Sequence, residues 1–322
     1  MARSKVSTMI QTTNKTLERL DKWYHRGIKQ KAGDSQRQEY MEATRPMRSL
    51  SEKNAPSLAI GDFQSNMLEK TFGVREGPRG CPILDISRNE MICIPIPLEP
   101  VLDNFERATR RSNQNETIMR SRLDIMLYLT LANEQRSAFY GHDLITPAVA
   151  QHMDEVSWAP EKHISQNVTY NNACRNLNGV MDYTLWWGIA DDLETNLVVV
   201  EAKAKDAASL SRAQALVSMA MIHAARKRAG KRDCRVFGIG TDSYDFWFLA
   251  IDNNSVWTSH YIRWYTSADK REIISRIGKI IREAAALVPT SNRSSLETAA
   301  SVRSKTGLII SDHEMEDVNE EE

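Results

Sequence analysis

The chain has few cysteines, and none of them is arranged for a shared structural role. Its 322 residues include four, at Cys81, Cys93, Cys174 and Cys234, with no Cys-x-x-Cys pair among them. This scatter argues against a zinc site of the finger type and against a disulfide framework. It is typical of proteins that work in a reducing compartment.

Long apolar runs are missing as well. No segment approaches the roughly 20 apolar residues that a membrane-spanning helix requires, and the first residues lack the apolar run of a signal peptide. Neither sign of charge dominates, because 42 Lys and Arg residues face 42 Asp and Glu residues. Net charge therefore indicates no partner, and we expect an intracellular protein, cytoplasmic or nuclear, with no membrane association.

Two common kinds of active site also lack support. No Ser/His/Asp or Cys/His order indicates acyl-transfer chemistry. The stretch Gly238-Ile-Gly240 is too short for a dinucleotide-binding fingerprint, which needs a third glycine and a following helix.

The distribution of apolar residues predicts three regions. Residues 1–95 are expected to form an N-terminal extension, largely flexible, with one basic helix over 15–30. Residues 96–289 carry the periodic apolar pattern of a folded domain. Residues 290–322 are expected to be a disordered acidic tail, since seven acidic residues and no Lys or Arg follow from Asp312 onward.

Within the central region we predict an α/β fold, a mixed sheet of about four to six strands flanked by helices. The first helix should run over 113–133, with Asn113 as N-cap and Glu116 at the third helical position. Strands at 180–187 and 197–202 should form a hairpin around a turn at 188–196. The remaining predictions are helices at 209–228 and 269–287 and strands at 235–240, 246–251 and 256–265.

The strand at 197–202 is unusual because an aliphatic run leads directly into charge. Leu197-Val-Val-Val200 reads as a buried strand, yet Glu201 follows at once and Lys203 lies two positions later. Residues two apart on a strand project from the same face. Asp182 stands in the preceding predicted strand, so two carboxylates and an ammonium are expected at one place.

These groups suit a hard divalent cation next to a phosphodiester. Mg²⁺ prefers oxygen ligands and keeps several waters, so Asp182, Glu201 and the backbone carbonyl of Ala202 would suffice. Lys203 would orient the attacking water or neutralise charge on the phosphate. A plainer interpretation stays open, in which Glu201 and Lys203 form a salt bridge and Asp182 caps a turn.

The pattern resembles the PD-(D/E)XK nuclease superfamily, whose signature is an Asp on the second core strand and a Glu/Asp-x-Lys on the third. Asp182 and Glu201-Ala-Lys203 match it, and Val236-Phe-Gly-Ile-Gly-Thr-Asp242 is similar to the closing strands of fungal PD-(D/E)XK-like proteins. The resemblance implies a restriction-endonuclease-like αβββαβ core. It also implies a catalytic Gln214 in the following helix and an accessory Glu116 in the first one. Met181 departs from the usual proline.

A local excess of positive charge follows these residues. From Lys203 to Arg235 there are nine Lys and Arg residues against two Asp. We expect a patch that tracks a nucleic-acid backbone, although a solvated helix end would explain part of it. The predicted patch consists of Arg226, Lys227, Arg228, Lys231, Arg232 and Arg235.

The sequence thus predicts a nuclease that hydrolyses phosphodiester bonds of DNA or RNA with Mg²⁺ or Mn²⁺. Nucleases of the resembled type often dimerise, so a homodimer is one expected assembly. Two alternatives remain: an inactive PD-(D/E)XK-like module that binds nucleic acid or protein, and a helical adaptor without a sheet. The strand tryptophans, including Trp247 and Trp257, are expected mostly to pack the sheet.

Overall fold

The computed structural model describes residues 55–287, except 79, 111, 113 and 187–197, together with Thr16, Arg19 and Thr44. The predicted turn at 188–196 and acidic tail at 290–322 lie outside the described residues. Apart from Thr16 and Arg19, so does the predicted helix at 15–30.

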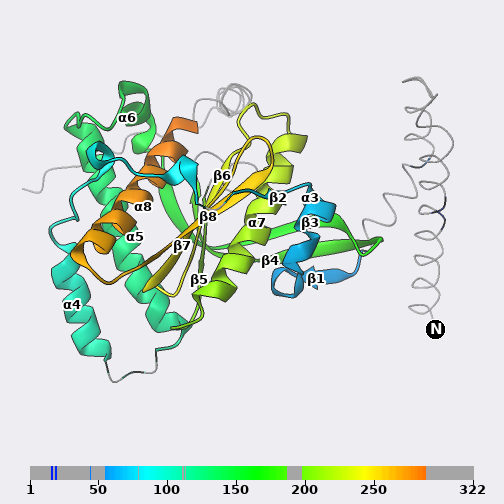
Figure 1. The fold of residues 1–322 in the computed structure, drawn as a ribbon, viewed down its shortest axis with the longest axis horizontal. Coiled ribbons are helices and arrows are strands. Elements are labelled where there is room, and N and C mark those ends of the chain that lie inside the picture. Colours follow the sequence, from blue (N-terminus) through cyan, green and yellow to red (C-terminus); the bar gives the residue numbers. More distant parts are fainter. Residues whose placement is uncertain are drawn as a thin grey trace, which may run out of the picture.

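An eight-stranded mixed sheet forms the centre of the molecule (Figure 1). Its strand order is β1-β4-β5-β6-β7-β8-β2, and β3 pairs with β4 off this path. The pairs β1–β4, β5–β6 and β2–β8 are parallel, and the others are antiparallel. The strands are β1 (Ser57–Ala59), β2 (Arg75–Glu76), β3 (Ser157–Tyr170), β4 (Ala173–Trp186), β5 (Val198–Ala202), β6 (Val236–Thr241), β7 (Asp245–Ile251) and β8 (Val256–Arg263).

Helices cover both faces of this sheet (Figure 1). One face carries α4 (Leu98–Thr109), α5 (Glu116–Phe139), α6 (Pro147–Met153) and α8 (Ser267–Leu287). The other face carries α7 (Ala208–Arg228) and the shorter α3 (Leu68–Phe72). The predicted mixed α/β architecture is confirmed, and a helical adaptor without a sheet is excluded.

The strand β5 lies inside the sheet, between β4 and β6, and is buried along its whole length. Val198 and Val200 pack into the core beneath α5 and α8, whereas Val199 packs beneath α7. Since side chains alternate along a strand, Glu201 projects on the α7 face. The hairpin of β4 and β5 is confirmed by their antiparallel pairing, with Tyr183 opposite Val200.

Residues 55–95 differ from the flexible extension that we predicted. They supply β1 and β2 to the sheet, and Ile60, Phe63 and Leu68 are buried against α7 and β4. Short 3₁₀ turns link these pieces: η1 (Ile60–Asp62), η2 (Ser65–Met67), η3 (Pro82–Leu84) and η4 (Arg88–Glu90). The apolar residues here are too widely spaced to show a helix or strand period. They are buried by segments that are distant in the sequence, so the local pattern does not indicate their burial.

The start of α5 also differs from the prediction. Its N-cap is Asn115, whose side chain accepts a hydrogen bond from the Ile118 amide, and Asn113 lies outside the described residues. Glu116 is therefore the first helical residue, and the helix continues to Phe139. The prediction failed because asparagines at both 113 and 115 can cap a helix, and the sequence alone does not choose between them.

Gly240 in β6 allows α7 to lie close to the sheet. A Cβ atom at this position would stand 2.6 Å from the backbone nitrogen of Arg212. Because the obstacle is helix backbone, a larger residue has to push the whole first turn of α7 outward. The Gly-Ile-Gly sequence therefore serves helix–sheet packing.

We predict that Gly240→Ala lowers the free energy of unfolding by about 1–3 kcal/mol, the usual cost of overpacking. Gly61→Ala is the matched control, since a Cβ there meets only the end of the Gln214 side chain at 3.3 Å. Chemical denaturation of both variants measures the difference. Equal stability of the two would contradict the close approach.

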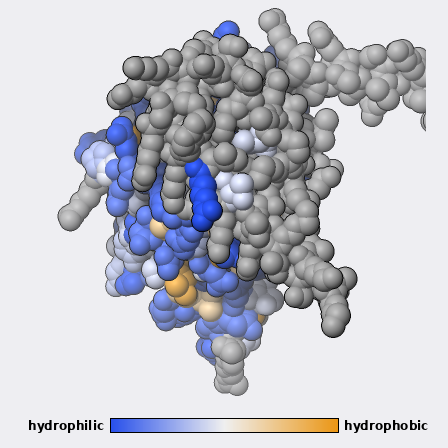
Figure 2. Space-filling view, turned by 90° about the vertical axis from the view of Figure 1, so that its right-hand side faces the viewer, coloured by the Kyte–Doolittle hydropathy of each residue, from blue (hydrophilic) through white to orange (hydrophobic). Residues whose placement is uncertain are grey.

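Among the described residues, no helix has the length and apolar character needed to cross a membrane. Where these residues reach the surface in Figure 2, that face is largely hydrophilic with one small hydrophobic patch. No broad apolar area is visible there.

Candidate active site

The strands β4 and β5 separate where the candidate site begins. Their pairing ends at Tyr183 opposite Val200. One step further, the Asp182 carboxylate accepts a hydrogen bond of 2.6 Å from the amide of Ala202. A side chain thus takes a place that a backbone carbonyl fills in a regular ladder. The Asp182 carboxylate is consequently held in the gap between the two strands.

Glu201 lies next to this gap, deep under α7. Its side chain is 2% exposed and that of Asp182 is 4% exposed. The Ser218 hydroxyl of α7 is the only hydrogen-bond partner of the Glu201 carboxyl among the described residues, at 3.5 Å from Oε1. The structure therefore brings the two predicted carboxylates together in a largely dry place.

Burial makes these carboxylates reluctant to ionise. Desolvation raises the pKa of Glu201 to about 8, and the nearby Asp182 charge adds to this rise. Desolvation also raises the pKa of Asp182, although the Ala202 amide, Lys203 and Arg120 oppose it. Two adjacent buried carboxylates are expected to share a proton or to bind a cation.

Arg120 of α5 supplies positive charge that the sequence analysis did not anticipate. Its Nη2 atom forms a close ion pair with Asp182 Oδ1 and lies 2.9 Å from Glu116 Oε1. Its Nη1 atom lies 3.5 Å from Glu161 Oε1. The guanidinium thus contacts three carboxylates. Its position one helical turn after Glu116 is the only signal in the sequence that could have indicated it.

Lys203 lies at the more exposed side of the site, with 20% of its side chain accessible. Its ammonium donates to the Ala202 carbonyl at 3.0 Å and lies 3.8 Å from Glu116 Oε2. The plainer interpretation, a Glu201–Lys203 salt bridge, finds no support, because the described ion pair of Lys203 is with Glu116. The Ala202 carbonyl, predicted as a third metal ligand, here accepts from Lys203.

The loop that follows Lys203 is held by Asp242, another residue that the sequence analysis did not assign to the site. The Lys203 amide donates to the Thr241 carbonyl at 3.0 Å. The buried Asp242 carboxylate accepts from the amides of Asp206 and Asp245, each at 2.7 Å. The Gly-Thr-Asp segment therefore positions the chain next to the site.

Gln214 stands on α7, one turn before Ser218. Its Oε1 atom is buried without a hydrogen-bond partner among the described residues, and its Nε2 atom faces Gly61. In the part of the chain that the structure describes, no hydrogen bond joins Gln214 to Asp182 or Glu201. Its predicted catalytic role stays a prediction, but a buried acceptor without a donor leaves room for a water or a ligand.

The predicted basic patch lies at the far end of α7. The Glu201 carboxyl contacts Ser218 in the middle of α7, so the helix end at Arg228 lies about 15 Å further along the helix axis. Arg226 is fully buried and donates to the Asp233 carbonyl, and Arg235 pairs with Asp233 and Glu283. Lys227 donates to Ser255 Oγ. These contacts stabilise the turn before β6, and the exposed remainder is Lys227, Arg228 and Arg232, with Lys231 partly exposed.

The oxygen atoms of the site are ligands of the kind that a hard cation such as Mg²⁺ prefers. Within the described residues no group of three or more His, Cys, Asp and Glu side chains gathers as metal ligands. Asp182 and Glu201 nevertheless offer carboxylate oxygens, and Mg²⁺ needs only one or two carboxylates when waters and phosphate complete its shell.

No family model and no curated protein matches this chain.

We predict that protein stability without metal falls as pH rises from 5 to 8. The unfolded Glu201 carboxyl ionises near pH 4.5, whereas the folded one keeps its proton to about pH 8. Folding therefore takes up a proton in this window, and the free energy of unfolding decreases as the pH rises. Because one unit of pKa shift corresponds to about 1.4 kcal/mol, the total decrease is several kcal/mol at most.

Glu201→Gln should flatten this dependence and make the protein more stable than wild type at pH 8. Urea denaturation at pH 5, 6.5 and 8 in the presence of a chelator measures it. The conservative change Asp103→Asn, at an exposed position of α4, is the control. A wild-type slope in Glu201→Gln would show that this carboxyl ionises normally.

Proposed function

We propose that this protein is a metal-dependent nuclease that hydrolyses phosphodiester bonds of DNA or RNA. The observation that carries the proposal is the pair of buried carboxylates, Asp182 and Glu201, with the Lys203 ammonium beside them at the end of strand β5. Burying two carboxylates side by side is costly unless a cation compensates them. A function that uses a cation explains the arrangement best.

The order of elements supports a restriction-endonuclease-like core. The elements α5, β3, β4, β5, α7 and β6 follow one another as αβββαβ, with only the short α6 inserted. Asp182 stands on the second of these strands and Glu201 on the third. This arrangement agrees with the PD-(D/E)XK resemblance of the sequence.

Each side chain has a distinct role in the proposed reaction. Asp182 and Glu201 would hold Mg²⁺ or Mn²⁺, which when bound supplies a Lewis acid and water of lowered pKa. Lys203 would neutralise charge that develops on the phosphate in the transition state. Glu116 keeps the Lys203 ammonium at the mouth of the site. The Arg120 guanidinium can contact two phosphate oxygens at once.

The ion pair between Arg120 and Asp182 favours a second function that does not require a metal ion. The Arg120 guanidinium pairs with the carboxylate that a metal would need, so the same fold could serve as an inactive module that binds nucleic acid or protein. The two functions differ in one respect: the nuclease must accept a divalent cation between Asp182 and Glu201, and the inactive module need not.

Cleavage assays test the nuclease. Glu201→Gln, Asp182→Asn and Lys203→Met should each lower the rate of single-strand and plasmid cleavage with Mg²⁺ or Mn²⁺ by at least about 100-fold, the usual effect of losing a transition-state contact. Asp103→Asn, which changes an exposed carboxylate on α4, should cleave like wild type. Equal rates in all five proteins, including wild type, would reject the proposal.

The Arg120→Met variant tests whether the arginine and a metal ion compete for the Asp182 carboxylate. Without metal at pH 8, removal of this partner leaves Asp182 buried and unpaired, so the melting temperature should fall. Millimolar Mg²⁺ should then raise it by more than in wild type, because binding only to the folded state stabilises it. Calorimetric melting with and without Mg²⁺ measures both effects, and an Mg²⁺ response absent from both proteins would favour the inactive module.

A further inference from the structure

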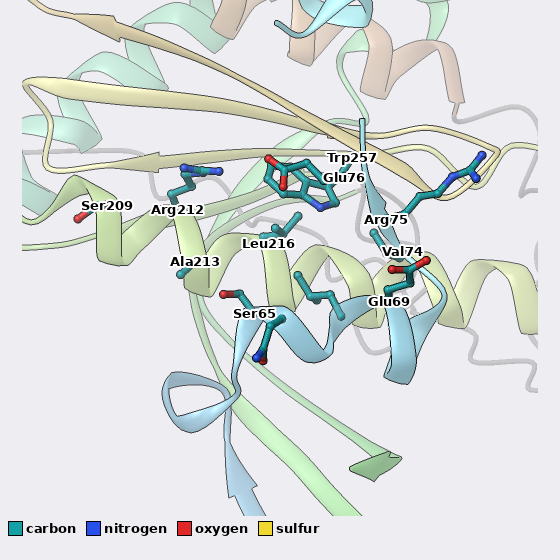
Figure 3. Close-up of a pocket in the computed structure, with 12 residues that line it drawn as sticks. Ser65, Glu69, Val74, Arg75, Glu76, Ser209, Arg212, Ala213, Leu216 and Trp257 are labelled. Carbon is teal, nitrogen blue, oxygen red and sulfur yellow. The ribbon is translucent and has the colours of Figure 1, made fainter. Parts of the chain in front are cut away.

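A groove lies beside α7, on the face of the sheet that carries Glu201. It consists of two adjoining cavities of about 450 and 410 Å³ that share Glu76, Arg212 and Trp257. Each has the size of a pocket for a small organic ligand. Figure 3 shows the first cavity, with Arg212 reaching from α7 toward Trp257 and Glu76. We call the two cavities together the Arg212 groove.

The side chains of Trp247, Trp257 and Tyr261 line the second cavity of this groove, and Trp257 also lines the first. Trp247 and Tyr261 lie on neighbouring strands with ring centroids 4.9 Å apart. The Trp247 side chain is half-buried and Tyr261 is 43% exposed. Such rings provide flat faces on which another flat group can stack.

The Arg212 guanidinium lies over the rings of Trp247 and Trp257, and its side chain is partly exposed. Its guanidinium carbon stands 4.6 Å from the Trp247 ring centroid and 5.4 Å from that of Trp257. Within the described part of the chain its guanidinium forms no ion pair or hydrogen bond. Its five N–H donors are therefore free for a phosphate or for the edge of a base.

Two carboxylates oppose this positive charge across the groove. Glu69 lines the first cavity, and Glu76 lines both and stands opposite Trp257 in the register of β2 and β8. Carboxylates repel phosphate but accept hydrogen bonds from the exocyclic amino groups of bases. This pattern suits a ligand whose base points inward and whose phosphate lies by Arg212.

The register of the sheet connects the groove with the candidate site. Glu201, Gly240, Trp247 and Tyr261 stand opposite one another on four successive strands. Paired residues share a face of the sheet, so Trp247 lies two strands from Glu201, or about 10 Å. The first turn of α7 lies over Gly240 between them.

We propose that the Arg212 groove binds unpaired nucleotides of a single strand whose neighbouring phosphate lies at Asp182 and Glu201. The inference rests on the proposed nuclease function and adds its substrate class. Bases stack on Trp247 and Tyr261, Glu76 contacts their amino groups, and Arg212 holds the backbone. A base-paired duplex presents no free base faces to these rings, so single strands bind in preference.

Fluorescence anisotropy with labelled single strands of about 12 nucleotides, within the usual range of binding sites, tests this. The protein carries Glu201→Gln and the buffer contains a chelator, so that no cleavage occurs. Arg212→Ala and Trp247→Ala should each raise the Kd at least about fivefold, the lower end expected for losing one stacking contact. Trp247→Phe, which keeps a ring, should lose less.

Controls come from the opposite face of the sheet. Arg107→Ala on α4 and Tyr128→Ala on α5 remove an exposed arginine and an exposed tyrosine there, and both should bind like the parent protein. Tyr261→Ala repeats the aromatic test at a more exposed position in case Trp247→Ala does not fold, which thermal melting reveals.

The outcomes separate the two proposals. Single-strand binding that depends on Arg212 and on the aromatic rings supports the groove, even if the cleavage assay rejects the nuclease. Unchanged affinity in Arg212→Ala and in both aromatic variants, or duplex bound as tightly as single strand, overturns the groove, even if cleavage is observed.

Discussion

The hydrogen bond from the Ala202 amide to the Asp182 carboxylate is the contact on which the candidate site depends. It satisfies a buried amide that the departing strand β4 no longer serves. It thereby allows β4 and β5 to separate without an orphaned donor, which would cost about 1–3 kcal/mol. The same bond fixes one carboxylate oxygen, and the other oxygen pairs with the Arg120 guanidinium. Glu201 then follows on β5, buried beneath α7 by the alternation of the strand.

Electrostatic compensation decides what this arrangement can do. In the described structure Arg120 neutralises Asp182, while burial keeps the proton on Glu201. A divalent cation would replace both the proton and part of the arginine contact. Under the proposed function the site would have two states, one in which Arg120 and a proton neutralise the carboxylates and one in which a metal ion does. The proposed nuclease and the proposed inactive module differ in which state is stable at physiological metal concentration.

Local patterns predicted much of the fold. Apolar periodicity located α7 and α8 nearly to the residue, because each has a continuous apolar side and a clear end, such as Gly230 after α7. The strands β5 to β8 were equally visible as short apolar runs between turns. The same methods missed β1 and β2, which are three and two residues long. Such short strands form only because they pair with β4 and β8 of the sheet.

The sequence by itself determined which side chains could form the site, since an aliphatic run leads directly into Glu201 and Lys203 follows two positions later. Only the tertiary structure decided their surroundings. It brought Arg120 from α5 against Asp182, put the basic end of α7 about 15 Å beyond the Ser218 contact, and placed Trp247 beside Arg212. Those outcomes depend on how helices cross the sheet and on strand register. Both are set by packing between segments far apart in the chain, which no local pattern records.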